Sequence, residues 1–91
     1  MKNIKVENMT TASGNTAPNQ FIIGTPKGVY FQSYDTVIAF KPNNGKTVLD
    51  KNAWDYSRTT SKYLGWFLGE NKAQTRKKIE TKEYLLKDLN K

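Results

Sequence analysis

Two short β-rich runs, each split by turn-forming residues, constrain the fold more than any other feature of this chain. FIIGTPKGVYFQS is broken by Thr25-Pro26-Lys27-Gly28, in which proline fixes φ for a turn and glycine tolerates a positive φ. TVIAFKPNNGKTVLD is broken by Asn44-Gly45. Asn-Gly is typical of two-residue hairpin turns, because both central residues of such a turn need a positive φ. The pattern predicts an antiparallel meander, with strands near residues 20–25, 28–33, 36–41 and 46–50.

The third predicted strand is apolar on nearly both faces. Its apolar residues are Val37, Ile38, Ala39 and Phe40. A continuous apolar run between turn signals is typical of a strand that is buried on both sides, and this favours a central position in the sheet. We therefore expect the C-terminal half of the chain to cover one face of the sheet.

The stretch WDYSRTTSKYLGWFLGE predicts a short helix over residues 58–68. Asp55 or Ser57 can cap its start by accepting a backbone N–H, and Gly69 follows where helices often end in the left-handed conformation. The apolar stripe of this helix is Tyr63, Leu64, Phe67 and Leu68. We expect Trp54 and Phe67 to be largely buried. Trp66 lies off the stripe and next to Lys62, so it is a candidate surface residue.

Asn71 can cap a second helix in KAQTRKKIETK. The only large apolar residue of this segment is Ile79, so the helix should lie on the surface. The following segment, EYLLKDL, fits either an extension of that helix or a strand. We favour a final strand within residues 83–89.

Together these elements indicate an α+β fold, in which a four- or five-stranded antiparallel meander sheet has one or two short helices on one face. A small SH3-like or OB-like β-barrel with a terminal helix is the alternative. NMTTASGNTAPNQ is rich in small and polar residues, so residues 1–19 are expected to be a flexible lead-in to a single domain over residues 20–91. If this segment is ordered, Ile4 and Val6 would add an edge strand.

Three segments of the chain resemble one protein family. GVYFQSYDTVIAF, WDYSRTTSKYLGWFLGE and TRKKIETKEYLLKDLN are similar to the pattern of a family of small uncharacterised proteins from bacteriophages and other mobile elements. The resemblance covers residues 20–90. It departs at Thr81-Lys82, where members of the family often have a glycine. The resemblance implies a mobile-element origin, names no activity and assigns no catalytic or binding residues.

Side chains with catalytic chemistry are scarce. The chain has no histidine and no cysteine, which excludes Ser-His and Cys-His pairs and thiolate metal sites. GTPKG and GENK lack the spacing of a phosphate-binding loop. Ser57 and Lys62 could act as a pair only if the lysine were deeply buried, and we interpret them as a helix cap and a solvated charge. We interpret Asp50 and Asp55 as loop charges, and we predict no enzyme activity, no cofactor and no metal site.

Positive charge is concentrated in the second half of the chain. The net charge is +7, and residues 51–91 carry ten lysines and arginines against five acids. Basic side chains interleaved with aromatic rings suit contact with phosphates and stacking on exposed bases. The candidate site for nucleic acid or another polyanion consists of Arg58, Lys62, Trp66, Lys72, Arg76, Lys77, Lys78 and Lys82.

Nucleic acid is therefore the leading predicted partner of a small basic protein without enzyme activity. The alternative is an inhibitor or adaptor that binds a host protein, for example an anti-defence protein that blocks a CRISPR effector. No apolar stretch approaches the ~20 residues that span a bilayer, and no apolar core of a secretory signal follows the N-terminus. We expect a protein of the bacterial cytoplasm with no membrane partner.

Overall fold

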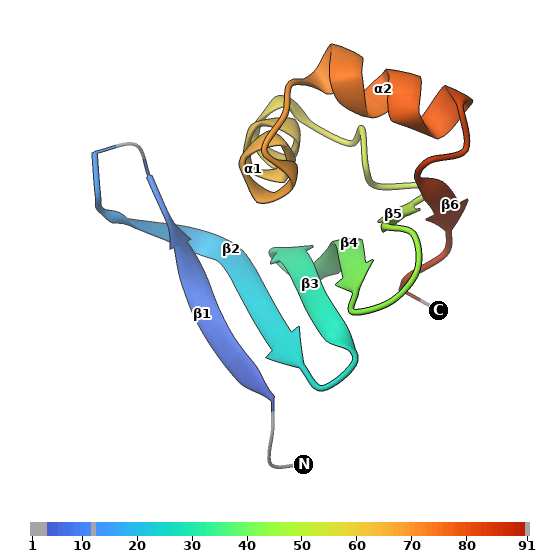
Figure 1. Cartoon of the computed structure of the whole chain (residues 1–91). Helices are drawn as coiled ribbons and strands as arrows, with labels where there is room; N and C mark the ends of the chain where they lie inside the picture. Colours follow the sequence, from blue (N-terminus) through green and yellow to red (C-terminus); the bar gives the residue numbers. More distant parts are fainter. Residues whose placement is uncertain (1–3, 12, 91) are drawn as a thin grey trace.

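The computed structural model describes residues 4–11 and 13–90, which have an α+β fold (Figure 1). Within these residues, one sheet holds six strands in sequence order. The strands are β1 (Lys5–Thr10), β2 (Thr16–Thr25), β3 (Gly28–Ser33), β4 (Thr36–Pro42), β5 (Val48–Asp50) and β6 (Leu85–Lys87). Two helices, α1 (Arg58–Leu68) and α2 (Lys72–Glu80), separate β5 from β6. The predicted α+β class is confirmed, with six strands rather than four or five.

The sheet is antiparallel up to its last strand. β1 to β5 form the predicted meander, whereas β6 runs parallel to β5, with Val48 opposite Leu85. A parallel neighbour needs a crossover connection, and the segment with α1 and α2 supplies it. β1 and β6 are the two edges. The sheet is therefore open and does not form the barrel that was the alternative.

The N-terminal segment contributes an edge strand. β1 pairs with β2, with Val6 opposite Ile23, and β2 begins earlier in the chain than the predicted start of the first strand. Ala17 of β2 is fully buried. Over β1, the structure therefore shows the edge strand that was the alternative to a flexible lead-in. Residues 1–3 and 12 of the predicted flexible segment lie outside the described residues, and the mobility of that segment stays a prediction.

Two connections between strands are tight turns, and the first of them lies at the predicted Thr25-Pro26-Lys27-Gly28. Between β2 and β3, the Thr25 hydroxyl oxygen accepts hydrogen bonds from the N–H groups of Lys27 and Gly28, each at 3.2 Å. Between β3 and β4, only Tyr34 and Asp35 form the turn. The φ of Tyr34 is 56°, in the left-handed region that non-glycine residues rarely occupy.

The hairpin predicted around Asn44-Gly45 forms between β4 and β5, but the prediction of a two-residue turn is wrong. The connection between β4 and β5 runs over residues 43–47, and only Gly45 of the pair has a positive φ, at 105°. The Asn43 N–H donates to the Lys27 carbonyl oxygen at 2.9 Å, which holds the start of the loop against the turn between β2 and β3. The chain therefore turns back later, and β5 starts after the predicted position.

The hydrophobic core lies between the helices and one face of the sheet. Phe31 of β3 is fully buried in the same cluster as Tyr63 and Leu64 of α1. The rings of Phe31 and Phe67 stack with their centroids 5.7 Å apart. The expectation that the C-terminal half covers one face is confirmed. Trp54 and Phe67 pack against this core but are only partly buried, so they are more exposed than predicted.

The opposite face of the sheet carries no helix among the described residues, since both helices lie on one side of the sheet (Figure 1). Successive side chains of a strand point to opposite faces of the sheet, so Tyr30 points away from Phe31 and from the helices. Tyr30 stacks on Phe40 with ring centroids 4.2 Å apart. We call the partly exposed residues Phe21, Ile23, Tyr30, Val37 and Phe40 the outer face.

Local signals fix both ends of α1 and the start of α2 as predicted. The Ser57 side chain accepts a hydrogen bond from the Thr60 N–H at 3.1 Å and caps α1. Gly69 ends α1 in the left-handed conformation, with a φ of 74°. Asn71 caps α2 through reciprocal hydrogen bonds with Gln74. The final strand, favoured over a helix extension, is confirmed as β6.

Candidate functional site

The eight residues of the predicted site divide between the two helices. Arg58, Lys62 and Trp66 are on α1, Lys72, Arg76, Lys77 and Lys78 are on α2, and Lys82 follows α2. Their charges differ in whether a neighbouring acid compensates them. This difference separates the cations that are paired with an acid from those that are not.

Arg58, Lys62 and Trp66 follow one another at four-residue intervals on the exposed side of α1, and we call them the α1 ridge. The Lys62 ammonium lies 5.2 Å from the centre of the Trp66 ring, within cation–π range. Trp66 is 41% exposed, and its ring meets the Tyr63 ring edge-on with centroids 5.0 Å apart. Because α1 contains no acidic residue, the ridge combines positive charge with an accessible aromatic surface.

Lys72 and Arg76, by contrast, both pair with Asp55 in the loop that leads into α1. Lys72 forms a salt bridge with one carboxylate oxygen of Asp55, and the Arg76 guanidinium lies 3.6 Å from the other. The Arg76 guanidinium also lies 5.8 Å from the centre of the Trp54 ring. These two cations therefore hold α2 against the loop, and their positive charge is partly neutralised.

Lys78 belongs to a network centred on Glu70, whose side chain is only 5% exposed. The Glu70 carboxylate accepts hydrogen bonds from the Lys78 ammonium at 2.8 Å, the Thr75 hydroxyl at 2.6 Å and the Tyr84 hydroxyl at 2.9 Å. A buried carboxylate is tolerated when donors satisfy it in this way. The network ties together the connection after α1, the side of α2 and the segment before β6.

The ionisation of this network follows from its geometry. Burial raises the pKa of Glu70, but the hydrogen bonds from Lys78, Thr75 and Tyr84 lower it more strongly, so its pKa lies below that of an ordinary glutamate. The hydrogen bond to Glu70 raises the pKa of Lys78. Burial and the same carboxylate raise the pKa of the Tyr84 hydroxyl. Lys78 is therefore a structural partner of Glu70 at neutral pH.

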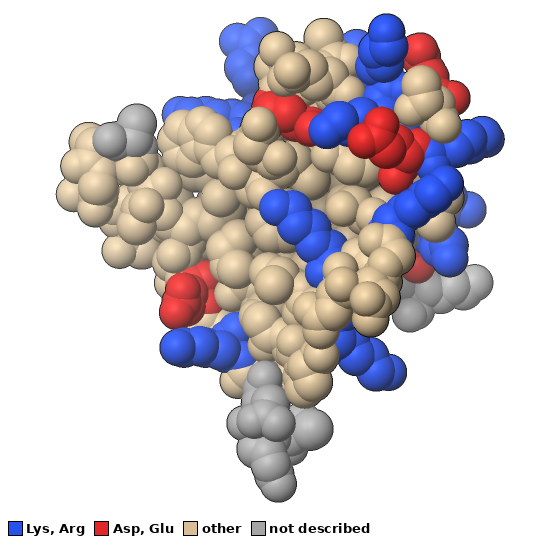
Figure 2. All heavy atoms as spheres, viewed as in Figure 1, with Lys and Arg blue, Asp and Glu red and all other residues tan. Residues whose placement is uncertain are grey.

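Lys77 and Lys82 are exposed, and neither they nor the basic residues of the α1 ridge form a salt bridge within residues 4–11 and 13–90. Lys82 has a φ of 68°, in the region that favours glycine. The left-handed turn at Thr81-Lys82 therefore forms without a glycine. Figure 2 shows the basic residues gathered mainly over the α2 end of the molecule, with acidic residues among them.

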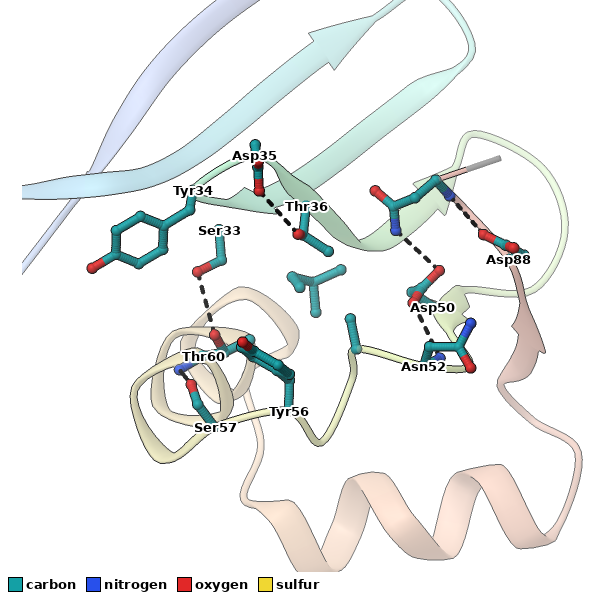
Figure 3. Close-up of a pocket in the computed structure, with 13 residues that line it drawn as sticks. Ser33, Tyr34, Asp35, Thr36, Asp50, Asn52, Tyr56, Ser57, Thr60 and Asp88 are labelled. Atoms are coloured by element: carbon teal, nitrogen blue, oxygen red, sulfur yellow. Dashed lines mark hydrogen bonds between the residues drawn. The ribbon is translucent and has the colours of Figure 1, made fainter.

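A polar pocket of about 760 Å³ lies beside the start of α1 (Figure 3). Its walls come from the turn between β3 and β4, the loop between β5 and α1, the first turn of α1 and the segment after β6. The lining residues are Ser33, Tyr34, Asp35, Thr36, Ile38, Asp50, Asn52, Ala53, Tyr56, Ser57, Thr60, Asp88 and Asn90. Ser57 caps α1 directly before Arg58, so the pocket lies at the end of α1 where the ridge begins.

Hydrogen bonds fix the inner wall of the pocket. The Asp50 carboxylate is 2% exposed and accepts hydrogen bonds from the Leu89 N–H at 2.8 Å and the Asn90 side chain at 3.1 Å. The Asn90 side chain also accepts from the Val37 N–H at 2.6 Å and donates to the Val37 carbonyl oxygen at 2.9 Å. Asp50 and Asn90 thus fasten the C-terminal segment to the sheet, and most of their hydrogen-bonding capacity is used within the protein.

The pocket differs in charge from the rest of this basic protein. Its lining has three aspartates, Asp35, Asp50 and Asp88, and no lysine or arginine. None of the three forms a salt bridge within the part of the chain that the structure describes. Among the described residues, no group of three acidic side chains could hold a metal ion.

The sequence interpretation missed this pocket and treated Asp50 as a loop charge. No local pattern marks it, because its residues come from segments that the fold brings together. The Ser57 and Lys62 side chains do not act on each other in the way a catalytic pair would. Ser57 caps α1, and the exposed Lys62 lies over the Trp66 ring.

Fold and site define a small basic α+β domain that has a mostly antiparallel sheet, two helices on one face and a polar pocket beside the first helix. The chain belongs to a family of unknown function (DUF8033), whose model matches residues 4–83. The match begins at the N-terminal strand rather than at residue 20, and it ends before Asp88 and Asn90 of the pocket. The family is uncharacterised, as the resemblance implied, and the match carries nothing about a phage or mobile-element origin.

No curated protein and no solved structure matches the chain. Neither helix in the described residues is long and apolar enough to cross a membrane.

Proposed function

We propose that this protein is a non-enzymatic binding protein that contacts nucleic acid through the α1 ridge. The observation that supports the proposal is the ridge itself. Arg58 and Lys62 have no salt-bridge partner among the described residues, and Trp66 exposes 41% of its surface next to them. Positive charge and an open aromatic ring on one helix face suit a strand that offers both phosphates and bases.

The spacing of the ridge also suits an extended ligand. Residues four apart on a helix are separated by about 6 Å along its axis. Arg58, Lys62 and Trp66 therefore form a line over two turns of α1, along which a backbone can meet first the two cations and then the ring. Lys77 and Lys82 add positive potential that raises the rate of encounter with a polyanion.

The cations on α2 contribute less to this proposed surface. Asp55 holds Lys72 and Arg76, and Glu70 holds Lys78. A phosphate that recruited them would have to compete with a carboxylate already in contact. The proposed interface therefore centres on three of the eight residues predicted from the sequence.

The test is a fluorescence-anisotropy titration with single-stranded and double-stranded probes at about 50 mM and about 200 mM salt. Wild-type binding should weaken steeply with salt, because phosphate contacts release counterions. Lys62→Glu should weaken binding to both probes. Trp66→Ala should weaken binding to the single strand by about 1–3 kcal/mol and leave duplex binding nearly unchanged, because only an unpaired base can stack on the ring.

Lys27→Glu is the matched control, since Lys27 is an exposed lysine on the turn between β2 and β3, away from the ridge. It changes the net charge as Lys62→Glu does. Equal losses in the two variants would show that the ridge has no special role. Absence of wild-type binding at low salt with tens of micromolar protein would contradict the proposal, because ordinary non-specific affinity would already be visible there.

The second candidate function is binding of a host protein, as an inhibitor or adaptor of phage or mobile-element origin that acts against host defence. The outer face favours it, because Ile23, Tyr30 and Phe40 expose apolar surface on a side of the sheet that no described helix covers. The two functions differ in their response to salt. Contact through the outer face should persist at high salt and after nuclease treatment, whereas contact through the α1 ridge should not.

A further inference from the structure

We propose that the pocket beside the α1 ridge receives one unpaired base of a bound single strand and prefers bases that carry an exocyclic amino group. This inference rests on the proposed nucleic-acid function and adds a specificity to it. The volume of the pocket, about 760 Å³, is in the range of ligand pockets. Arg58, the first residue of the ridge, directly follows the lining residue Ser57, so the pocket lies at the end of α1 where the ridge begins.

The charge of the pocket decides which part of a nucleotide can enter. Asp35 and Asp88 line it without a compensating cation, and Asp50 lies in its wall. A phosphate would meet carboxylates there and be repelled. Outside the pocket, Arg58 and Lys62 attract phosphate. A strand that passes Arg58 at the start of α1 can therefore keep its phosphates outside the pocket while it turns one base inward.

The unused hydrogen-bonding capacity of the lining favours donors on the ligand. Asp35 accepts one bond from the Thr36 hydroxyl at 3.3 Å, and Asp88 accepts one from the Asn90 N–H at 3.0 Å. A carboxylate has about four acceptor sites, so both retain acceptors for a ligand. The amino groups of cytosine (N4) and adenine (N6) are donors, whereas thymine and uracil present a carbonyl oxygen at the corresponding position, and guanine carries its amino donor on the other side of the ring, at N2.

Two tyrosines border the pocket, and their rings lie differently. Tyr56 is 76% exposed, and its ring lies beside Ser57 and Thr60 on the helix side of the pocket (Figure 3). The Tyr34 ring is directed outward from the turn between β3 and β4 and away from the other lining side chains (Figure 3). Tyr56 is therefore the ring on which an inserted base can stack, and Tyr34 provides a matched position that should not contact it.

The experiment compares oligo(dC) and oligo(dU) of equal length by fluorescence anisotropy at pH 7.5. These strands share a backbone and differ on the base edge, where cytosine has an amino donor and uracil an acceptor. Wild-type protein should bind oligo(dC) about tenfold more tightly, which is within the discrimination of a good base contact. Asp35→Ala and Tyr56→Ala should each reduce this preference without changing the salt dependence.

Tyr34→Ala should keep the preference for oligo(dC), and melting temperatures should show that every variant is folded. Lys62→Glu should weaken the binding of both oligonucleotides by the same factor, because the ridge contacts the backbone. Equal binding of the two strands by wild type, or an unchanged preference in both Asp35→Ala and Tyr56→Ala, would overturn the pocket proposal and leave the proposed function standing. If wild type binds neither strand at low salt, the proposed function fails and the pocket proposal fails with it.

Discussion

Glu70 shows how a single residue joins three parts of the fold. Its carboxylate accepts hydrogen bonds from Lys78, Thr75 and Tyr84, and the side chain is almost completely withdrawn from water. Bonds to an ionised group are stronger than neutral ones, and removing the charge leaves buried donors without a full set of acceptors. The network therefore stabilises the placement of α2 beside α1 and β6.

We predict that Glu70→Gln lowers the free energy of unfolding at pH 7 by about 1–3 kcal/mol. The folded-state pKa of Glu70 is lowered, so its contribution is fully present above the unfolded-state pKa, about 4.3, and is lost as pH falls through the folded-state value. The stability difference between wild type and variant should therefore narrow below that pH. Urea titrations at several pH values measure it, and a gap that stays constant down to pH 3 would contradict the network.

At the scale of an element, α1 contains a glycine, a residue of low helix propensity, in its interior. Gly65 lies within the helix, and a Cβ placed on it would lie 2.9 Å from the Glu70 carbonyl oxygen. The Gly65 carbonyl oxygen accepts the N–H groups of Gly69 at 2.7 Å and Glu70 at 3.0 Å, which folds the chain back over the helix end. The glycine therefore permits the close approach that starts the connection to α2.

We predict that Gly65→Ala destabilises the protein, although alanine is better than glycine in a helix by about 1 kcal/mol. The new Cβ would force the Glu70 carbonyl outward and disturb the network around its side chain, with a net loss of about 1–2 kcal/mol. Thr59→Ala, at an exposed position of the same helix, should be neutral or slightly stabilising. If chemical denaturation shows Gly65→Ala to be more stable than wild type, the close approach does not constrain α1.

The elements themselves could be predicted from sequence where the signal is local. Ser57, Gly69 and Asn71 marked helix ends, because a capping side chain or a left-handed glycine acts on its immediate neighbours. The turn at Asn44-Gly45 was misplaced because hydrogen bonds from Asn43 to another turn override the local preference. β1 was given only as an alternative, because its polar sequence becomes a strand through its pairing with β2.

At the scale of the whole molecule, the site depends on contacts between distant segments, which residue patterns do not show. The sequence placed eight basic and aromatic residues in one surface, yet Asp55 and Glu70 compensate three of them. The pocket forms because β6 pairs parallel to β5, and this brings Asp88 and Asn90 to the start of α1. Neither the charge pairing nor the pocket has a local signature.

Two double charge reversals separate the structural cations from the proposed binding cations. Arg76→Glu with Lys78→Glu places a carboxylate beside Asp55 and another beside Glu70, so like charges replace salt bridges and the melting temperature should fall. Arg58→Glu with Lys62→Glu lowers the net charge equally but breaks no salt bridge among the described residues, and the change at Arg58 places an acid in the first turn of α1, where the helix dipole favours negative charge. Its melting temperature should be unchanged or slightly higher, while retention on single-stranded nucleic acid should be lost. Thermal melts and anisotropy on both variants decide the matter. If the α2 pair melts like wild type and loses binding as completely as the α1 pair, the cations of α2 belong to the interface after all.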